Sequence, residues 1–142
     1  MTVRFRNVDV PAEVRDWPYE AITTAIERGT IGDWAVLTRE IGQDPWGPVA
    51  RQVEDYLEYA EEPGVVGLFR RRITAARAAA EEAERAQVAE QVRELVRASG
   101  LTLEQFARAI GTSRPRLSTY RTGKVTPSAA LLVRMARVSA GL

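Results

Sequence analysis

The chain has 142 residues and a net charge of +1, and this length suits one or two small domains, each with its own core. It contains no cysteine and no histidine, which excludes a disulfide framework, the usual zinc sites and Ser-His or Cys-His nucleophiles, so we expect no enzyme, no metal and no cofactor. No apolar run reaches the roughly 18 residues of a membrane helix, and the charged start is unlike a signal peptide, which predicts a cytoplasmic protein without membrane contact.

Charge divides the chain into two halves. Residues 1–65 hold 6 arginines and 13 acidic residues, a net charge of −7, whereas residues 66–142 hold 14 basic and 6 acidic residues, a net charge of +8. Such asymmetry predicts two tasks. The basic half is the candidate for nucleic acid because phosphates attract cations, so the acidic half is expected to serve a different surface.

The first half is predicted to be a small acidic helical domain over residues 1–64. Residues 3–11 read as an extended arm or one edge strand. Three short helices are expected after it, over about residues 17–28, 30–41 and 44–60. Pro18 in the first turn marks the start of the first helix, and Gly29 marks its end. Thr30 with Asp33 is expected to cap the second helix, and Asp44-Pro45 is expected to start the third.

All three tryptophans lie in this half, near the heads of the predicted helices: Trp17, Trp34 and Trp46. The simplest interpretation is that they form the core of the helical domain. The alternative is an aromatic patch for a partner protein. Trp46, held between Pro45 and Gly47-Pro48, is the tryptophan that we expect to be exposed.

Residues 65–99 contain no proline and a single glycine, and they are rich in alanine, which predicts one long helix or two nearly continuous ones. Residues 65–87 are expected to connect the two domains. Apolar residues repeat there at the spacing of a coiled-coil seam: Phe69, Ile73, Ala76, Ala80 and Ala83. A coiled-coil dimer and a solvated linker helix are both open. The run at residues 70–72, three arginines, either contacts the DNA backbone or lies as a hydrated face near the acidic half.

Residues 88–142 are predicted to form four helices. Val92, Leu95 and Val96 give the first an apolar stripe that ends at Gly100. A Thr102 to Gln105 capping box opens the second, Ser113 caps the third, and Thr126-Pro127 is expected to cap the fourth. Glycines end the second and third helices at residues 111 and 123.

Two short helices joined by a three- or four-residue turn that contains Gly111 form a helix-turn-helix arrangement, whose second helix enters the major groove. Ala107 is expected where the two helices cross closely, and Leu117 is expected to anchor the second helix to the core. A capped helix pair with this spacing also occurs in other helical bundles.

The stretch from Leu101 to Lys124, LTLEQFARAIGTSRPRLSTYRTGK, resembles the core of the XRE family, the helix-turn-helix domains similar to the phage lambda and Cro repressors. The residues Thr126-Pro127-Ser128 resemble the family's next helix start. The resemblance covers about residues 88–142 without a gap. Leu103 stands where the family often has a phosphate-binding glutamine, and Arg121 stands where it often has glutamate.

The resemblance implies a DNA-binding surface made of Ser113, Arg114, Pro115, Arg116, Thr119, Arg121, Lys124, Thr126 and Ser128. Arginine can pair bidentately with guanine and threonine can contact a base or a thymine methyl, so Arg114, Arg116 and Thr119 are expected to read bases. Lys124, Thr126 and the backbone amide of Ser128 are expected to contact phosphates. A solvated surface position is the alternative for each arginine.

These predictions describe an all-α protein with an acidic helical domain, a connecting helix and a lambda-repressor-like helix-turn-helix domain. We expect a transcriptional repressor that binds an inverted-repeat operator in double-stranded DNA as a homodimer, because one such domain reads too few bases to find a site. The family often carries a further helix after the fourth, whereas this sequence stops at Leu142, so we expect the dimer contact in the first half.

Two alternatives stay open. One is an antitoxin whose acidic half binds a protein toxin while the helix-turn-helix autoregulates, and the runs at residues 16–20 and 44–48 resemble small helical regulators of high-GC bacteria, some linked to toxin-antitoxin pairs. The other is an architectural DNA binder with little sequence preference, which the arginine-rich composition allows.

Overall fold

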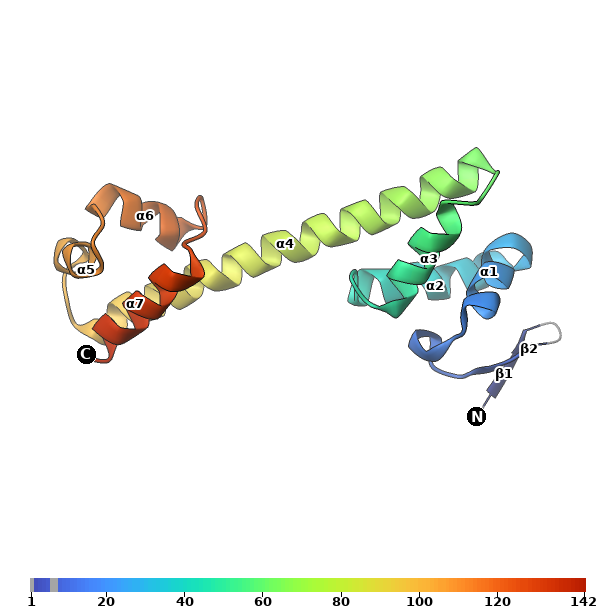
Figure 1. The fold of residues 1–142 in the computed structure, drawn as a ribbon, viewed down its shortest axis with the longest axis horizontal. Helices are drawn as coiled ribbons and strands as arrows, with labels where there is room; N and C mark the ends of the chain where they lie inside the picture. The colour runs from blue at the N-terminus through green and yellow to red at the C-terminus, as the bar shows by residue number, and fades with distance from the viewer. Residues whose placement is uncertain (1, 6–7) are drawn as a thin grey trace. The chain divides into compact units, whose positions relative to one another are not determined.

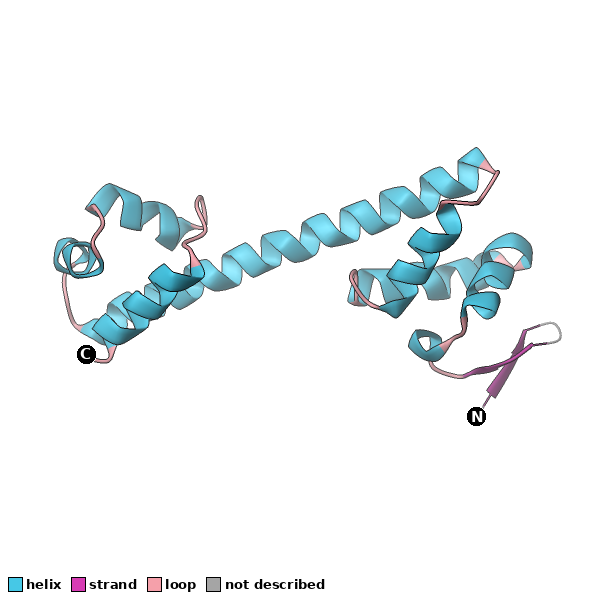
Figure 2. Cartoon of the chain, viewed as in Figure 1, coloured by secondary structure: helices cyan, strands magenta, loops and turns pink. Residues whose placement is uncertain are grey.

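The structure is a computed structural model that describes residues 2–5 and 8–142 (Figure 1). Seven α-helices, one short 3-10 helix and a two-stranded hairpin make up the described residues (Figure 2). Two compact units divide between Ala80 and Glu81. The predicted all-α class is confirmed, with the terminal hairpin as its one addition.

The hairpin consists of β1 (Thr2–Phe5) and β2 (Val8–Pro11), which pair antiparallel with Val3 opposite Val10. The sequence predicted an extended arm or one strand over residues 3–11, and the observed backbone is extended but folds back on itself. Residues 6 and 7 of that predicted arm lie outside the described residues.

Three short helices and a 3-10 turn follow: η1 (Val14–Asp16), α1 (Tyr19–Arg28), α2 (Ile31–Gln43) and α3 (Pro48–Leu57). Gly29 ends α1, as predicted. The Thr30 cap of α2 is a reciprocal box, in which Thr30 Oγ1 accepts from the Asp33 amide at 3.3 Å and Asp33 Oδ2 accepts from the Thr30 amide at 2.7 Å.

The predicted start of α3 at Asp44-Pro45 is wrong by one turn. Residues 44–47 form a turn that the Gly47 amide closes on the Asp44 carbonyl at 3.0 Å, and Pro48 is the first helical residue. A Cβ at Gly47 would meet the Asp44 carboxylate, so a larger residue there would require that side chain to move. Pro45 and Pro48 are both typical of a helix start. Because residues 44–47 form a turn, the helix begins at Pro48.

The first core lies between α1, α2, α3 and the beginning of α4 (Pro63–Ser99). Trp17 is buried in it, and Trp34 meets Phe69 edge to face with ring centroids 5.8 Å apart. The Trp34 indole donates to the carbonyl of Ala25 at 3.0 Å. Trp46 is 44% exposed, which confirms the expectation for this tryptophan.

The long α4 is one continuous helix, and its beginning belongs to the first core. Phe69, Ile73 and Ala76 are buried there, so three of the five predicted seam positions pack within the chain and cannot form a coiled-coil seam with a second copy. Arg72 Nε donates to the Thr38 carbonyl at 3.0 Å, which places this arginine against the acidic half.

Arg77 ties α4 to α3 and to the preceding turn. Its two terminal nitrogens donate to the Glu54 carboxylate at 2.9 and 2.6 Å, and its Nε donates to the Pro45 carbonyl at 2.9 Å. The guanidinium also lies 5.8 Å from the ring centre of Trp46. The hydrogen bonds from Arg77 lower the pKa of the Glu54 carboxyl against the opposing effect of burial.

The second unit consists of the last part of α4 with α5 (Leu103–Ile110), α6 (Arg114–Thr122) and α7 (Ala129–Ser139). Its core is apolar and is formed by Val92, Val96, Phe106, Ala107, Ile110, Leu117, Tyr120 and Met135. Within the described part of the chain, no helix is both long and apolar enough to cross a membrane.

Candidate nucleic-acid interface

The turn between α5 and α6 consists of three residues, Gly111, Thr112 and Ser113. Gly111 has a φ of +81°, a left-handed conformation that favours glycine, and it ends α5. The Thr112 amide donates to the Ala107 carbonyl at 2.9 Å. The Ser113 hydroxyl accepts from the Arg116 amide at 3.2 Å and starts α6 at once. The tight turn fixes the direction of α6 relative to α5.

Ala107 of α5 and Leu117 of α6 were predicted at the contact of these helices, and both lie in the second core. Ala107 is 1% exposed and Leu117 is fully buried in the second core. Arg134 of α7 also donates to the carbonyl of Ile110, the last residue of α5, at 2.8 Å. This bond supplies a partner for a helix-end carbonyl that has none within its own helix.

The end of α6 is fixed against α4. Arg93 of α4 donates to the Arg121 carbonyl, and the Val125 amide returns to the Thr119 carbonyl at 3.1 Å. Gly123 has a φ of +81°, and a Cβ there would lie 3.6 Å from the Ala89 side chain. The end of α6 is therefore held by α4, while its start is capped by Ser113.

The predicted base-reading residues lie in the first two turns of α6. Arg114, Pro115 and Arg116 are exposed, and the side chain of Arg114 has no hydrogen-bond or ion-pair partner within residues 12–142, whose side chains are described. Thr119 is half-buried, and its hydroxyl donates to the Arg116 carbonyl at 2.6 Å. Its methyl group and hydroxyl lone pairs remain for contacts outside the chain.

Arg116 differs from Arg114 because its Nε donates to the Tyr120 hydroxyl at 3.0 Å. Tyr120 is buried in the second core, and its contact with Arg116 was not predicted from the sequence. A signal was present, since a buried tyrosine hydroxyl needs a partner and Arg116 lies four residues earlier on the same helix.

Residues 87–140 match the model of a family described as a helix-turn-helix domain. This segment is a helix-turn-helix domain. The match runs from the last part of α4 to the end of α7, and it is consistent with the XRE resemblance of the sequence. Comparisons with curated proteins and with solved structures found no match for the chain.

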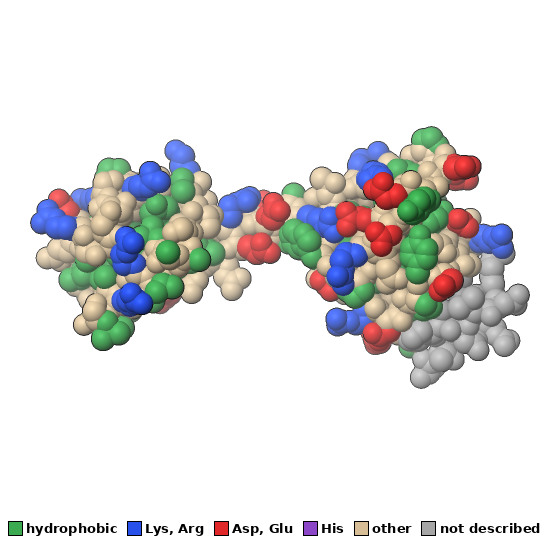
Figure 3. All heavy atoms as spheres, viewed as in Figure 1, with side chains coloured by type: hydrophobic (Ala, Val, Ile, Leu, Met, Phe, Trp, Pro, Cys, Tyr) green, Lys and Arg blue, Asp and Glu red, His purple; other side chains and the backbone are tan. Residues whose placement is uncertain are grey.

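The helix-turn-helix domain is strongly basic after its first helix. From residue 105 to residue 142 the sequence holds seven basic residues and no acidic residue. Most of the charged side chains on the face of this unit that Figure 3 displays are basic (blue). Such a surface attracts polyphosphate backbones.

The segment after α6 carries the remaining predicted contacts. Lys124 and Thr126 are exposed in the loop, and Ser128 is exposed at the start of α7. The prediction that Thr126-Pro127 caps α7 is wrong, because the Ser128 hydroxyl accepts from the Leu131 amide at 3.1 Å and Pro127 lies buried before it. Only the serine is placed to reach that amide.

Helix starts differ in their suitability for phosphate. The first turns of α6 and α7 contain no acidic residue, whereas α5 has Glu104 in its first turn. Negative charge there opposes an approaching anion. Leu103, the departure from the family's glutamine, is half-buried and packs on the second core.

Arg121 was expected at the surface, either at DNA or in solvent, but its side chain is partly covered by the protein. It is half-buried, and its Nε is buried without a hydrogen-bond partner among the described residues. The side chains of Arg93 and Arg134 donate to the backbone carbonyls of Arg121 and Ile110, and neither role was predicted from the sequence. The sequence offers no signal for these two roles, because an arginine on an exposed helix face is usually solvated.

Proposed function

We propose that the protein is a sequence-specific regulator of transcription whose α6 enters the major groove of double-stranded DNA. The observation that carries this proposal is the exposed first turn of α6, where Arg114 and Arg116 stand on a helix capped at its start and tied to α4 at its end. Rigid support of this kind keeps donors within reach of base edges. The domain around it lacks acidic residues after Glu104, so DNA is attracted over the whole face.

The surface residues divide into two roles. Arg114 and Arg116 read guanines through bidentate hydrogen bonds, and the Thr119 methyl packs on a thymine methyl. Ser113 and Pro115 shape the start of the helix, and Pro115 brings no amide hydrogen to a phosphate.

Lys124, Thr126 and the amides at the Ser128 cap bind phosphates and set the register on the duplex. Arg121 adds positive charge behind them. These contacts supply affinity for any sequence, whereas the first turn of α6 supplies the preference.

The regulator acts as a homodimer on an inverted repeat, and it represses by occupying a promoter. One domain contacts too few bases to select a site, so two domains must act together. In this proposal residues 1–64 form the dimerisation or partner-binding domain, residues 65–87 connect, and residues 88–142 bind DNA.

Selection of bound fragments from random DNA by the full-length protein tests the proposal. The expected result is an enriched palindrome whose half-sites lie about 10 base pairs apart, centre to centre, or a multiple of that spacing. Footprints on genomic DNA should then cover the same palindrome at promoters. Binding without any enriched sequence would contradict the proposal and support an architectural DNA binder.

A second candidate is an antitoxin that neutralises a protein toxin through its first half and autoregulates through the helix-turn-helix domain. The net charge of −7 on residues 1–65 favours it, because the first half then complements a basic protein. Co-expression with the product of a neighbouring gene tests it. The antitoxin relieves growth arrest, and it still does so with Arg114→Ala, which impairs only DNA binding.

A further inference from the structure

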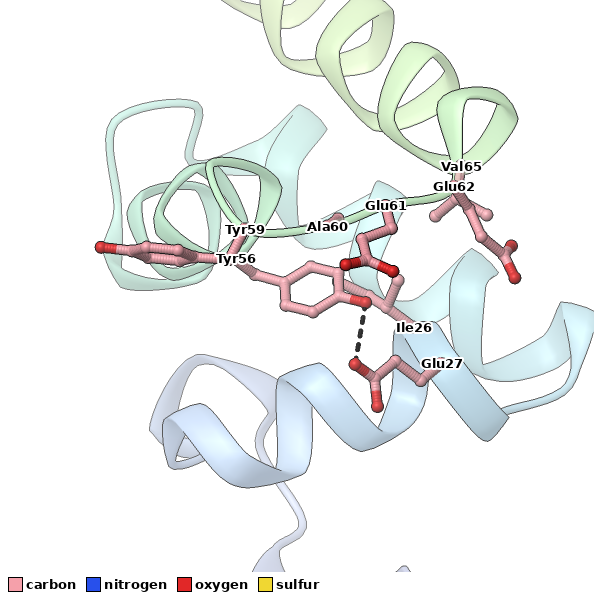
Figure 4. A pocket seen from close by; sticks show the side chains of 8 residues that line it. All are labelled: Ile26, Glu27, Tyr56, Tyr59, Ala60, Glu61, Glu62 and Val65. Carbon is pink, nitrogen blue, oxygen red and sulfur yellow. Dashed lines mark hydrogen bonds between the residues drawn. The ribbon is translucent and has the colours of Figure 1, made fainter.

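Two adjoining hollows lie on the first unit, outside the DNA-binding surface. The Glu27 hollow has a volume of about 460 Å³, and its walls include Ile26, Glu27, Tyr56 and Glu61 (Figure 4). The Asp55 hollow has a volume of about 410 Å³ and is lined by Tyr19, Asp55, Glu58 and Tyr59. Tyr59 also lines the Glu27 hollow, so one tyrosine forms a wall of both.

We propose that this acidic face docks a basic segment of a partner protein, with an arginine or lysine side chain in each hollow. The inference does not rest on the proposed DNA binding, because none of its residues belongs to the second unit. It names the surface and the chemistry that a partner of the first half requires.

Charge is the first argument. The two hollows hold five carboxylates among their lining residues and no lysine or arginine. They are carried by Glu27, Asp55, Glu58, Glu61 and Glu62. Glu58 has a cation at 3.9 Å, Arg70, but both side chains are more than half exposed and the pair is weak. A cationic side chain entering either hollow is therefore attracted, whereas DNA is repelled.

The tyrosines are the second argument. Tyr59 is 81% exposed and Tyr19 is 38% exposed, so aromatic rings stand at the surface beside the carboxylates. A guanidinium or ammonium group binds both a carboxylate and the face of an aromatic ring. Figure 3 shows hydrophobic and acidic side chains interspersed on this unit. Tyrosine and arginine are also the residues most enriched where interfaces gain their binding energy.

A fixed carboxylate is the third argument. Tyr56 Oη donates to Glu27 Oε1 at 3.0 Å, and the two side chains point toward one another in Figure 4. This bond orients the Glu27 carboxylate and leaves Oε2 for an incoming donor. Less conformational freedom is then lost on binding than with a free side chain.

Two hollows with a common wall fit a segment with two or more basic side chains better than a single cation. A cation in the Glu27 hollow meets Glu27, Glu61 and Glu62, and a cation in the Asp55 hollow meets Asp55 and Glu58. An isolated ammonium ion satisfies one hollow only. The occupant to which we commit is a basic segment of another protein, and a second copy of this chain is the competing outcome.

Calorimetry with the full-length protein tests the proposal, and the probe is a synthetic helical peptide rich in arginine and alanine. The double variant Glu27→Gln with Asp55→Asn should weaken peptide binding by at least about tenfold, or 1.4 kcal/mol. Tyr59→Ala, which changes no charge, should weaken it about threefold or more. The matched control, Glu81→Gln with Glu84→Gln, removes two charges from exposed positions of α4 and should change affinity less than about twofold.

Equal losses in the double variant and in the control would overturn the proposal, because binding would then follow net charge alone. No effect of Tyr59→Ala would overturn it as well. Self-association that Tyr59→Ala abolishes would assign the face to a second copy instead. Arg114→Ala should leave peptide binding unchanged, so a failure of DNA binding and a failure of this surface are separate results. Thermal unfolding of each variant checks the fold.

Discussion

The Arg116 guanidinium donates from Nε to the hydroxyl of Tyr120 at 3.0 Å, one turn further along α6. Tyr120 is 5% exposed and belongs to the second core, whereas Arg116 is exposed. A core residue thus holds Arg116, a residue of the proposed DNA-binding surface, through its Nε. The two terminal nitrogens of Arg116, which have no partner among the described residues, remain for a base.

Removal of this hydroxyl is expected to weaken operator binding without unfolding the domain. Tyr120→Phe keeps the buried ring and releases Arg116, so the operator affinity should fall about two- to tenfold, equivalent to roughly 0.5–1.5 kcal/mol for one hydrogen bond. The loss should vanish when Arg116 is already alanine. Fluorescence titrations of the four proteins of this double-mutant cycle measure it, and equal losses in both backgrounds would contradict the coupling.

Ala107 is 1% exposed in the second core, where we expect α5 and α6 to cross closely. Ala107→Leu should destabilise the helix-turn-helix domain by about 1–3 kcal/mol through overpacking. Ala109→Leu, at an exposed position of the same helix, is the matched control and should have little effect. Thermal unfolding of the two variants compares them. An unchanged midpoint for Ala107→Leu would place the helix crossing elsewhere.

The contact between Arg77 and Glu54 should make the stability of the first unit depend on pH in the acidic range. The hydrogen bonds from Arg77 hold the Glu54 pKa below 4.5, so their stabilisation is present above the unfolded pKa and is lost as pH falls through the folded value. The contact is partly exposed, so we expect at most about 1 kcal/mol. Arg77→Met should destabilise the protein at neutral pH, and the difference from wild type should shrink below about pH 4.

Denaturant titrations over this pH range measure the effect. Arg70→Met is the control, because Arg70 lies 3.9 Å from Glu58 and both side chains are more than half exposed. It should cost little at any pH. A constant difference between Arg77→Met and wild type across the range would mean that the carboxylate of Glu54 contributes nothing.

Tyr56 should titrate later than an ordinary tyrosine. Burial, reinforced by the hydrogen bond to Glu27, raises the pKa of Tyr56 from 10.0 to about 12. Because the folded pKa is raised, the stabilisation is complete below pH 10 and is lost as pH rises toward 12. Ultraviolet titration should show a late tyrosinate step that Tyr56→Phe removes and Tyr59→Phe leaves in place. A late step that survives Tyr56→Phe belongs to another residue.

Most helix limits could be predicted from the sequence because local chemistry fixes them. The caps at Thr30 and Thr102 and the left-handed Gly111 need no distant partner. The start of α3 was mispredicted because it depends on tertiary contacts. The Pro45 carbonyl accepts a hydrogen bond from Arg77, 32 residues away, and this contact stabilises a turn where the local pattern favours a helix.

The candidate site shows the same division. The exposed first turn of α6 follows from a cap, a proline and a glycine close by in the sequence. The contacts that hold α6 from Arg93 depend on how α4 packs, and an exposed helical arginine gives no local sign of it. Likewise, the spacing of Phe69 and Ile73 could not distinguish a seam between two chains from a core within one.

The ratio of operator affinity to random-DNA affinity tests the central claim most directly, measured for Arg114→Ala, Arg116→Ala and Lys124→Ala over a range of salt concentrations. Each arginine variant should lose about 1–3 kcal/mol on the operator and little on random DNA, so the ratio falls. Lys124→Ala should weaken both to similar degrees and flatten the slope of log K against log salt by about one unit, since one phosphate contact is lost. If both arginine variants weaken all DNA equally, α6 does not read bases, and the protein is an architectural DNA binder.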